Sequence, residues 1–160
     1  MAIREIPAMP FLESVKQTLT QNYCNFNGRA RRSEFWYFAL FTTIIGMLMS
    51  IIINFGSIGI IISLVVNLAL LLPSFGVAFR RLHDINKSGW YIGALYILLA
   101  VFLGLDGLYL STDSNIYLIL MCVILILLII YGIIMLVWYC KDSDPLPNQY
   151  GPSPKYIDVE

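Results

Sequence analysis

The sequence feature that most constrains the fold is an uncharged stretch of 45 residues, 35–79, between Glu34 and Arg80. A single transmembrane helix needs only about 20 residues, so this stretch predicts two helices. The turn-like sequence Asn54-Phe55-Gly56-Ser57 lies near its middle and marks the connection. We therefore expect transmembrane spans at 35–53 and 58–79, joined as a hairpin.

The composition agrees with a membrane protein. Hydrophobic residues make up 59% of the chain and charged residues only 12%, whereas a soluble globular protein carries about 25% charged residues. A net charge of zero gives no sign of the basic surface typical of nucleic-acid-binding proteins. Three scattered cysteines, Cys24, Cys122 and Cys140, predict neither a disulfide framework nor a zinc site.

Two further uncharged runs predict spans at 90–105 and 116–139. The 16 residues 90–105 rise only about 24 Å, short of the ~30 Å hydrocarbon core unless the helix continues past Asp106. The predicted fold class is thus an all-α membrane protein with four transmembrane helices. We expect an N-terminal segment at 1–34, a transmembrane domain at 35–139 and a proline-rich tail at 140–160.

The positive charges predict the orientation of the spans. With four spans, both termini and the loop between the second and third helices lie on one side. All ten cations fall there: Arg4, Lys16, Arg29, Arg31, Arg32, Arg80, Arg81, Lys87, Lys141 and Lys155. The opposite side has only Asp106 and Asp113. The positive-inside rule therefore predicts that both termini are cytoplasmic.

A short amphipathic helix is expected before the first span. Phe11, Val15, Leu19 and Tyr23 recur every four residues, which places them on one helix face. So close to a span, such a helix fits the cytoplasmic membrane interface. Packing of the same face onto the protein's own cytoplasmic loops is the alternative.

The first motif precedes the first span and combines arginines with aromatic residues. It contains Gly28, Arg29, Arg31, Arg32, Ser33, Glu34 and Trp36. Arginine pairs well with phosphate, Ser33 is a candidate helix cap, and Trp36 suits the headgroup layer. The motif predicts either an ordinary positive-inside anchor or a binding site for anionic lipid headgroups.

The second motif joins the second and third spans. It contains Arg80, Arg81, His83, Asp84, Lys87, Ser88, Gly89 and Trp90. His83 and Asp84 could suggest catalysis or metal binding, but adjacent helical residues do not face each other, and two ligands are too few for a usual metal site. We expect His83 to form a structural hydrogen bond, Asp84 to pair with an arginine of the first motif, and Ser88 to cap the next helix.

The spans contain few polar residues. Thr42, Gly46 and Ser50 form a small-residue stripe suited to helix packing, within one chain or in a homo-oligomer. A polar pore lining in an oligomer is the alternative. The predicted spans contain no Asp, Glu, Lys, Arg or His, which disfavours a pump or an ion-coupled carrier.

Three motifs together resemble a known family. They are Phe-x-Gly-Arg-x-x-Arg-x-Glu-Phe-Trp from Phe26, Arg-Arg-Leu-His-Asp-x-x-x-Ser-Gly-Trp from Arg80, and Asn-x-Tyr-Gly-x-x-Pro, which contains Asn148, Tyr150 and Gly151. The pattern resembles the bacterial inner-membrane family known as domain of unknown function 805. The resemblance implies a multi-pass protein of the bacterial inner membrane with cytoplasmic motifs, and no established activity, substrate or cofactor.

The leading functional interpretation is a non-enzymatic membrane protein whose basic cytoplasmic face binds anionic lipid or a membrane-protein partner. The candidate binding residues are Arg29, Arg31, Arg32, Arg80, Arg81 and Lys87. A small oligomeric channel or solute exporter is the alternative, and an interfacial enzyme using His83 and Asp84 is the least favoured. No cofactor, metal or nucleic-acid partner is expected.

Overall fold

The computed structural model describes residues 2–112 and 114–159. Asp113, one of the two acids expected on the side opposite the cations, lies outside the described residues. Contacts between residues group the chain into two compact units, 1–87 with 142–160, and 88–141. The sequence did not predict this division, in which the tail groups with the N-terminal half of the chain.

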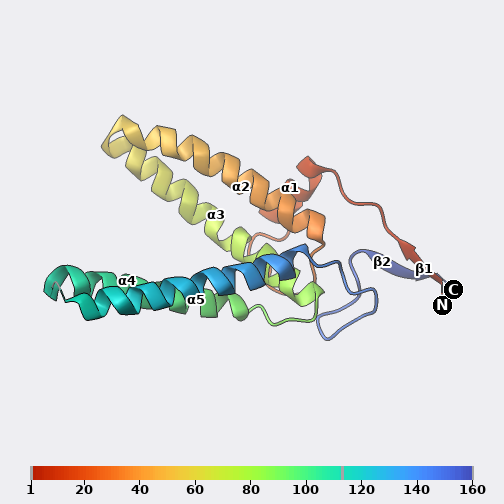
Figure 1. Cartoon of the computed structure of the whole chain (residues 1–160). Helices are drawn as coiled ribbons and strands as arrows, with labels where there is room; N and C mark the ends of the chain where they lie inside the picture. Colours follow the sequence, from red (N-terminus) through yellow and green to blue (C-terminus); the bar gives the residue numbers. More distant parts are fainter. Residues whose placement is uncertain (1, 113, 160) are drawn as a thin grey trace. The chain divides into compact units, whose positions relative to one another are not determined.

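The first unit is built around an antiparallel helix hairpin (Figure 1). Helix α2 spans Arg32–Ile52 and helix α3 spans Ser57–Asp84, with a short 3₁₀ helix, η1, at Ile53–Phe55. Gly56 has a φ of 76°, a conformation that glycine adopts readily. The turn therefore falls where the sequence predicted it.

Close approach of the two helices depends on Gly59 near the start of α3. A Cβ atom built at this position would lie 2.0 Å from the backbone oxygen of Ile52, so only glycine fits without a backbone shift. Ser63, one turn further along, donates a hydrogen bond to the Met49 oxygen of α2 at 3.2 Å. The backbones of α2 and α3 thus lie in close contact at the end of the hairpin next to η1.

The expected amphipathic helix is present as α1, Phe11–Thr20. Val15 is buried with Phe38 of α2 and Val77 of α3, and the Phe11 ring meets the Tyr37 ring edge-on at 5.6 Å. Part of its apolar face therefore packs on the protein's own helices, while Leu12 remains 78% exposed.

The two ends of the chain form a small sheet that the sequence did not predict. Strand β1, Ala2–Glu5, pairs antiparallel with β2, Tyr156–Val159, in the register Ala2↔Val159 to Glu5↔Tyr156. Such short strands carry little signal in one sequence, since their pairing joins segments about 150 residues apart.

The second unit is a helical hairpin of α4, Tyr91–Thr112, and α5, Asn115–Cys140. The Tyr131 hydroxyl of α5 donates to the Tyr91 backbone oxygen at 2.8 Å, and the Trp138 ring packs edge-on against the Tyr91 ring at 5.0 Å. Helix α4 runs six residues beyond Asp106, so its 22 residues rise about 33 Å. The helix therefore continues past Asp106, the alternative that the sequence left open, because one acid near a helix end does not stop the helix.

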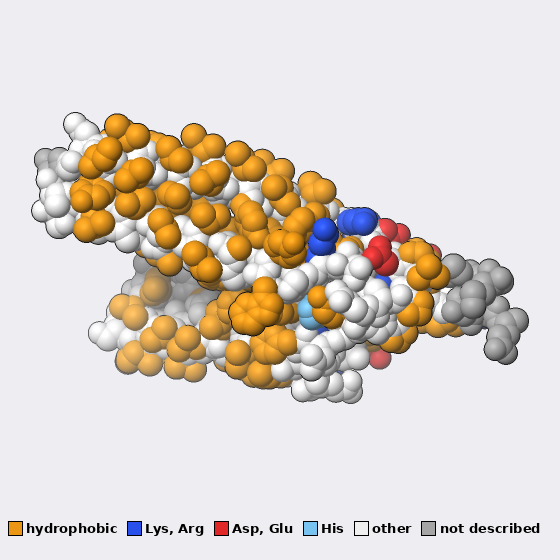
Figure 2. All heavy atoms as spheres, turned by 90° about the horizontal axis from the view of Figure 1, so that it is seen from below, with side chains coloured by type: hydrophobic (Ala, Val, Ile, Leu, Met, Phe, Trp, Pro, Cys, Tyr) orange, Lys and Arg blue, Asp and Glu red, His pale blue; other side chains and the backbone are white. Residues whose placement is uncertain are grey.

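Among the described residues, four helices are long and apolar enough to cross a membrane, and each overlaps one predicted span: Arg32–Phe55, Ser57–Asp84, Tyr91–Thr112 and Asn115–Cys140. On the face shown in Figure 2, hydrophobic side chains cover most of the helical surface, and the few charged side chains in view gather in one region. The protein is thus an all-α membrane protein with four transmembrane helices and an N-terminal amphipathic helix.

Candidate functional site

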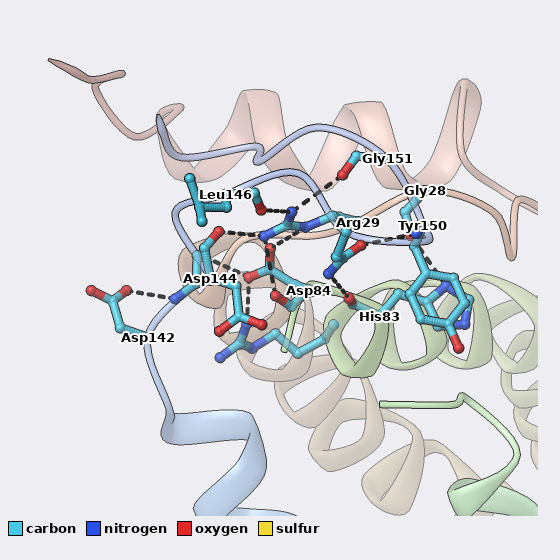
Figure 3. A network of polar contacts seen from close by, with 12 residues as sticks. Gly28, Arg29, His83, Asp84, Asp142, Asp144, Leu146, Tyr150 and Gly151 are labelled. Atoms are coloured by element: carbon cyan, nitrogen blue, oxygen red, sulfur yellow. Dashed lines mark hydrogen bonds and ion pairs between the residues drawn. The ribbon is translucent and has the colours of Figure 1, made fainter. Parts of the chain in front are cut away.

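The two arginine motifs meet at the C-terminal end of α3, where Asp84 is the centre of a polar network (Figure 3). The Asp84 side chain is fully buried. Its Oδ1 accepts a hydrogen bond from Arg29 Nε at 2.9 Å, and its Oδ2 accepts from Arg81 Nη1 at 2.6 Å and from the Ser143 hydroxyl at 2.5 Å. Two arginines and a hydroxyl therefore compensate one buried carboxylate.

Arg29 connects three distant segments of the chain. Besides Asp84 Oδ1, its guanidinium donates to the backbone oxygens of Asp84 at 3.1 Å, Asp144 at 2.5 Å, Leu146 at 2.9 Å and Gly151 at 3.3 Å. A guanidinium has five N–H donors, and these contacts can use all five. The tail that follows α5 is thus wrapped around one buried arginine.

The exposed carbonyls of the α3 C-terminus are also satisfied by this network. The last carbonyls of a helix have no partner within the helix. Here the Asn148 side chain donates to the His83 oxygen at 2.9 Å, and Ala30 N–H donates to the Arg80 oxygen, one turn before the helix end, at 2.9 Å. The first motif and the tail motif therefore act as a shared cap for α3.

His83 links the middle loop to the first motif. Its Nδ1 lies 3.1 Å from the Gly28 oxygen, and since a carbonyl only accepts, Nδ1 carries the proton. The ring stacks on Tyr150 with centroids 3.8 Å apart. Gly28 and Gly151 have φ values of 81° and 121°, which explains why glycine suits both turns.

Arg80 forms a second buried ion pair, with Glu34 of α2. Its Nη1 lies 2.7 Å from Glu34 Oε1, and the two side chains are 5% and 10% exposed. This contact ties the start of α2 to the end of α3. Adjacent arginines of one motif therefore pair with different acids.

The remaining candidate cations are more accessible. Arg31 is half-buried and donates to the backbone oxygens of Pro7 and Ile6, both at 2.8 Å. Arg32 is exposed and Lys87 is half-buried. The six predicted binding residues thus fall into a buried group, Arg29, Arg80 and Arg81, and an accessible group, Arg31, Arg32 and Lys87.

The acids near the two arginine motifs, Glu34 and Asp84, are fewer than the arginines. Backbone carbonyls of the tail supply the further acceptors for Arg29, whose side chain is 1% exposed, and Arg81 is 0% exposed. One expectation from the sequence is corrected by this geometry. Ser33 does not cap α2, because the helix begins one residue earlier and Arg31 is its N-cap residue, without a side-chain capping bond.

The other motif residues take local roles at the helix ends. The Ser88 hydroxyl accepts a hydrogen bond from Trp90 N–H at 3.3 Å, as expected for a residue just before α4. Trp90 is 78% exposed and Trp36 is 38% exposed. Gly89 is buried. The two tryptophans thus offer the accessible aromatic surface that suits a headgroup layer.

A surface ion pair holds the last part of the tail. Lys155 Nζ lies 2.7 Å from Asp142 Oδ2 and 3.6 Å from Glu5 Oε1. The hydrogen bond from Lys155 holds the pKa of Asp142 below its ordinary value, and Asp142 in turn raises the pKa of Lys155. Both groups therefore stay charged near neutral pH.

The fold and the buried network define the class of protein: a four-span membrane protein with a buried arginine–aspartate cluster at the C-terminal end of α3. We call this cluster, formed by Arg29, Arg81 and Asp84, the clasp. The chain belongs to the family described as protein of unknown function (DUF805), whose family model matches residues 23–152. That range includes the clasp and the Asn148–Gly151 turn, but not β1, β2 or α1.

Two inner membrane proteins of Escherichia coli (strain K12) are similar to this chain. Inner membrane protein YhaH is 31% identical over 141 residues, covering 84% of this chain and 91% of the relative. Inner membrane protein YhaI is 28% identical over 140 residues, covering 87% of this chain and 93% of the relative. No solved structure matches the chain.

The contact between His83 and Gly28 generates the first prediction. His83→Gln keeps a donor for the Gly28 carbonyl, whereas His83→Leu leaves this carbonyl unpaired at a cost of about 1 to 3 kcal/mol. We expect the Leu variant to melt at a lower temperature in detergent than the Gln variant. Equal stability of both variants with the wild type would contradict a structural role for His83.

Proposed function

We propose that this protein is a non-enzymatic membrane protein that binds anionic phospholipid headgroups. Binding takes place at its basic end, which consists of the cation-bearing segments before α2, between α3 and α4 and after α5, on the cytoplasmic side. The observation that carries the proposal is the distribution of cations. All ten lie before or at the start of α2, after α5 or around the α3–α4 connection, and the sequence has no Lys or Arg at 33–79 or 88–140.

Several of these cations are available for contact. Arg4, Lys16, Arg32 and Lys141 are exposed. Each Lys or Arg near an anionic membrane surface contributes about 1 kcal/mol of attraction, so a handful of them suffices for a preference. The exposed Trp36 and Trp90 add the amphipathic rings that favour this depth.

The buried arginines have a different role in this proposal. Arg29 and Arg81 hold the basic end together and do not contact lipid. Lipid attraction is left to the accessible cations, which makes the two roles separable by mutation.

A lipid-binding experiment tests the proposal. Protein reconstituted in nanodiscs that mix phosphatidylglycerol with phosphatidylcholine is expected to enrich the anionic lipid around itself. Arg32→Gln combined with Lys87→Gln removes two accessible charges and should weaken this preference by up to about 2 kcal/mol, with a smaller effect at high salt.

Asp106→Asn is the control. It also removes a charge, but Asp106 lies near the C-terminal end of α4, away from the α3–α4 connection. It should leave the lipid preference unchanged. A double variant that retains the wild-type preference, measured by mass spectrometry of the bound lipid, would refute the proposed function.

The cytoplasmic placement of the basic end has its own test. Single cysteines are introduced at exposed positions in a chain whose Cys24, Cys122 and Cys140 are replaced. Positions 55 and 110, where the native side chains are 76% and 77% exposed, should react with a membrane-impermeant thiol reagent from the periplasm. Positions 86 and 146 should be protected until the cytoplasmic side is opened, and periplasmic labelling at 86 would contradict the orientation.

A further inference from the structure

Arg80 differs from Arg29 in having buried donors without an acceptor. Its Nη1 is used by Glu34, but its Nε and Nη2 have no hydrogen-bond partner among the described residues. The side chain is only 5% exposed. A buried charged donor that lacks a partner carries the full cost of its desolvation.

Arg80 lines a cavity of about 380 Å³. This volume lies at the small end of the range for small-molecule sites. The cavity walls come from the segment before α1, α1 itself, the following loop, the first motif, the start of α2, the end of α3 and the tail. They include Gln17, Asn22, Asn25, Arg31, Glu34 and Arg80.

The chemistry of these walls favours an anion with several acceptor oxygens. The amides and guanidinium groups are donors, and the carboxylate among these six residues, Glu34, is already engaged by Arg80 Nη1. The Nε and Nη2 atoms form one edge of the guanidinium plane, and such an edge matches two oxygens of a phosphate. The positive charge of Arg31 on the same wall adds to the attraction.

The position of Arg80 along α3 places the cavity near headgroup depth. Helix α3 begins at Ser57, and the 23 residues to Arg80 rise about 35 Å. A hydrocarbon core is about 30 Å thick. A helix that enters the core near Ser57 therefore brings Arg80 to the opposite phosphate layer.

We propose that this cavity is a specific binding site for a phosphate group, with the Nε–Nη2 edge of Arg80 as its two-pronged donor. The inference rests on the proposed function and deepens it, since it adds one saturable site to a diffuse attraction. A phospholipid headgroup and a free phosphate share this chemistry, and the experiment separates them.

The experiment uses the full chain in detergent with two probes, inorganic phosphate and short-chain phosphatidylglycerol, and measures binding by native mass spectrometry and titration. We expect saturable binding of one probe per chain. Saturation by phosphatidylglycerol alone would identify a lipid headgroup as the occupant, and saturation by inorganic phosphate would identify a free phosphate. Saturation by neither probe would overturn the site.

Two variants assign the binding to the cavity. Arg80→Lys keeps the charge but removes the two-pronged edge, and should lower the affinity for the bound probe roughly ten-fold or more. Gln17→Glu adds a carboxylate to the cavity wall from α1 and should have a similar effect without altering the Arg80–Glu34 pair, so it decides the outcome if Arg80→Lys fails to fold. Wild-type affinity in folded variants would overturn the site.

The result is independent of the test of the proposed function. Loss of lipid preference in the Arg32→Gln and Lys87→Gln double variant concerns two cations that do not line this cavity. Saturable binding that this double variant retains but Arg80→Lys loses would support the cavity site alone.

Discussion

A carboxylate buried at the end of a transmembrane helix is the constraint on which the rest of this structure depends. Asp84 has no exposed side-chain surface, and an uncompensated charge in such a place would cost several kcal/mol. Arg29, Arg81 and Ser143 supply that compensation. Because Arg29 and Ser143 come from the two ends of the chain, satisfying Asp84 also closes the first unit.

Arginine is the residue type that this arrangement requires. Arg29 donates to Asp84 and to three further backbone oxygens in directions that only a planar fork with five donors can serve. A lysine has three donors on one nitrogen and would leave carbonyls of the tail unpaired. The tail conformation therefore depends on the shape of Arg29 as well as on its charge.

The transmembrane helices could be predicted from the sequence, whereas the partners at their ends could not. Uncharged length and the Gly56 turn located α2 and α3 within a few residues, because hydrophobic thickness is a local requirement. An ion pair between Asp84 and an arginine of the first motif followed from charge complementarity, and only the structure identifies this arginine as Arg29. The acceptors at Asp144, Leu146 and Gly151 are backbone carbonyls, which every residue has, so no side-chain pattern points to them.

The unpaired Nε–Nη2 edge of Arg80 could not be predicted from the sequence, for a related reason. Arg80 and Arg81 are adjacent and chemically identical, and only the fold directs one toward Asp84 and the other toward Glu34 and a cavity. The sequence pattern alone predicted that both belong to one binding surface. The structure separates the arginines that hold the protein together from those available to an anion.

The most direct test of this account is the coupling energy between Arg29 and Asp84. Stability in detergent is measured for Arg29→Gln, Asp84→Asn and the double variant. Removing one partner of a buried pair costs about 3 to 5 kcal/mol, and the double variant should cost clearly less than the sum of the two, with a coupling above about 1 kcal/mol. Effects that add within about 0.5 kcal/mol would mean that the two residues act independently and would contradict the central role of the buried pair.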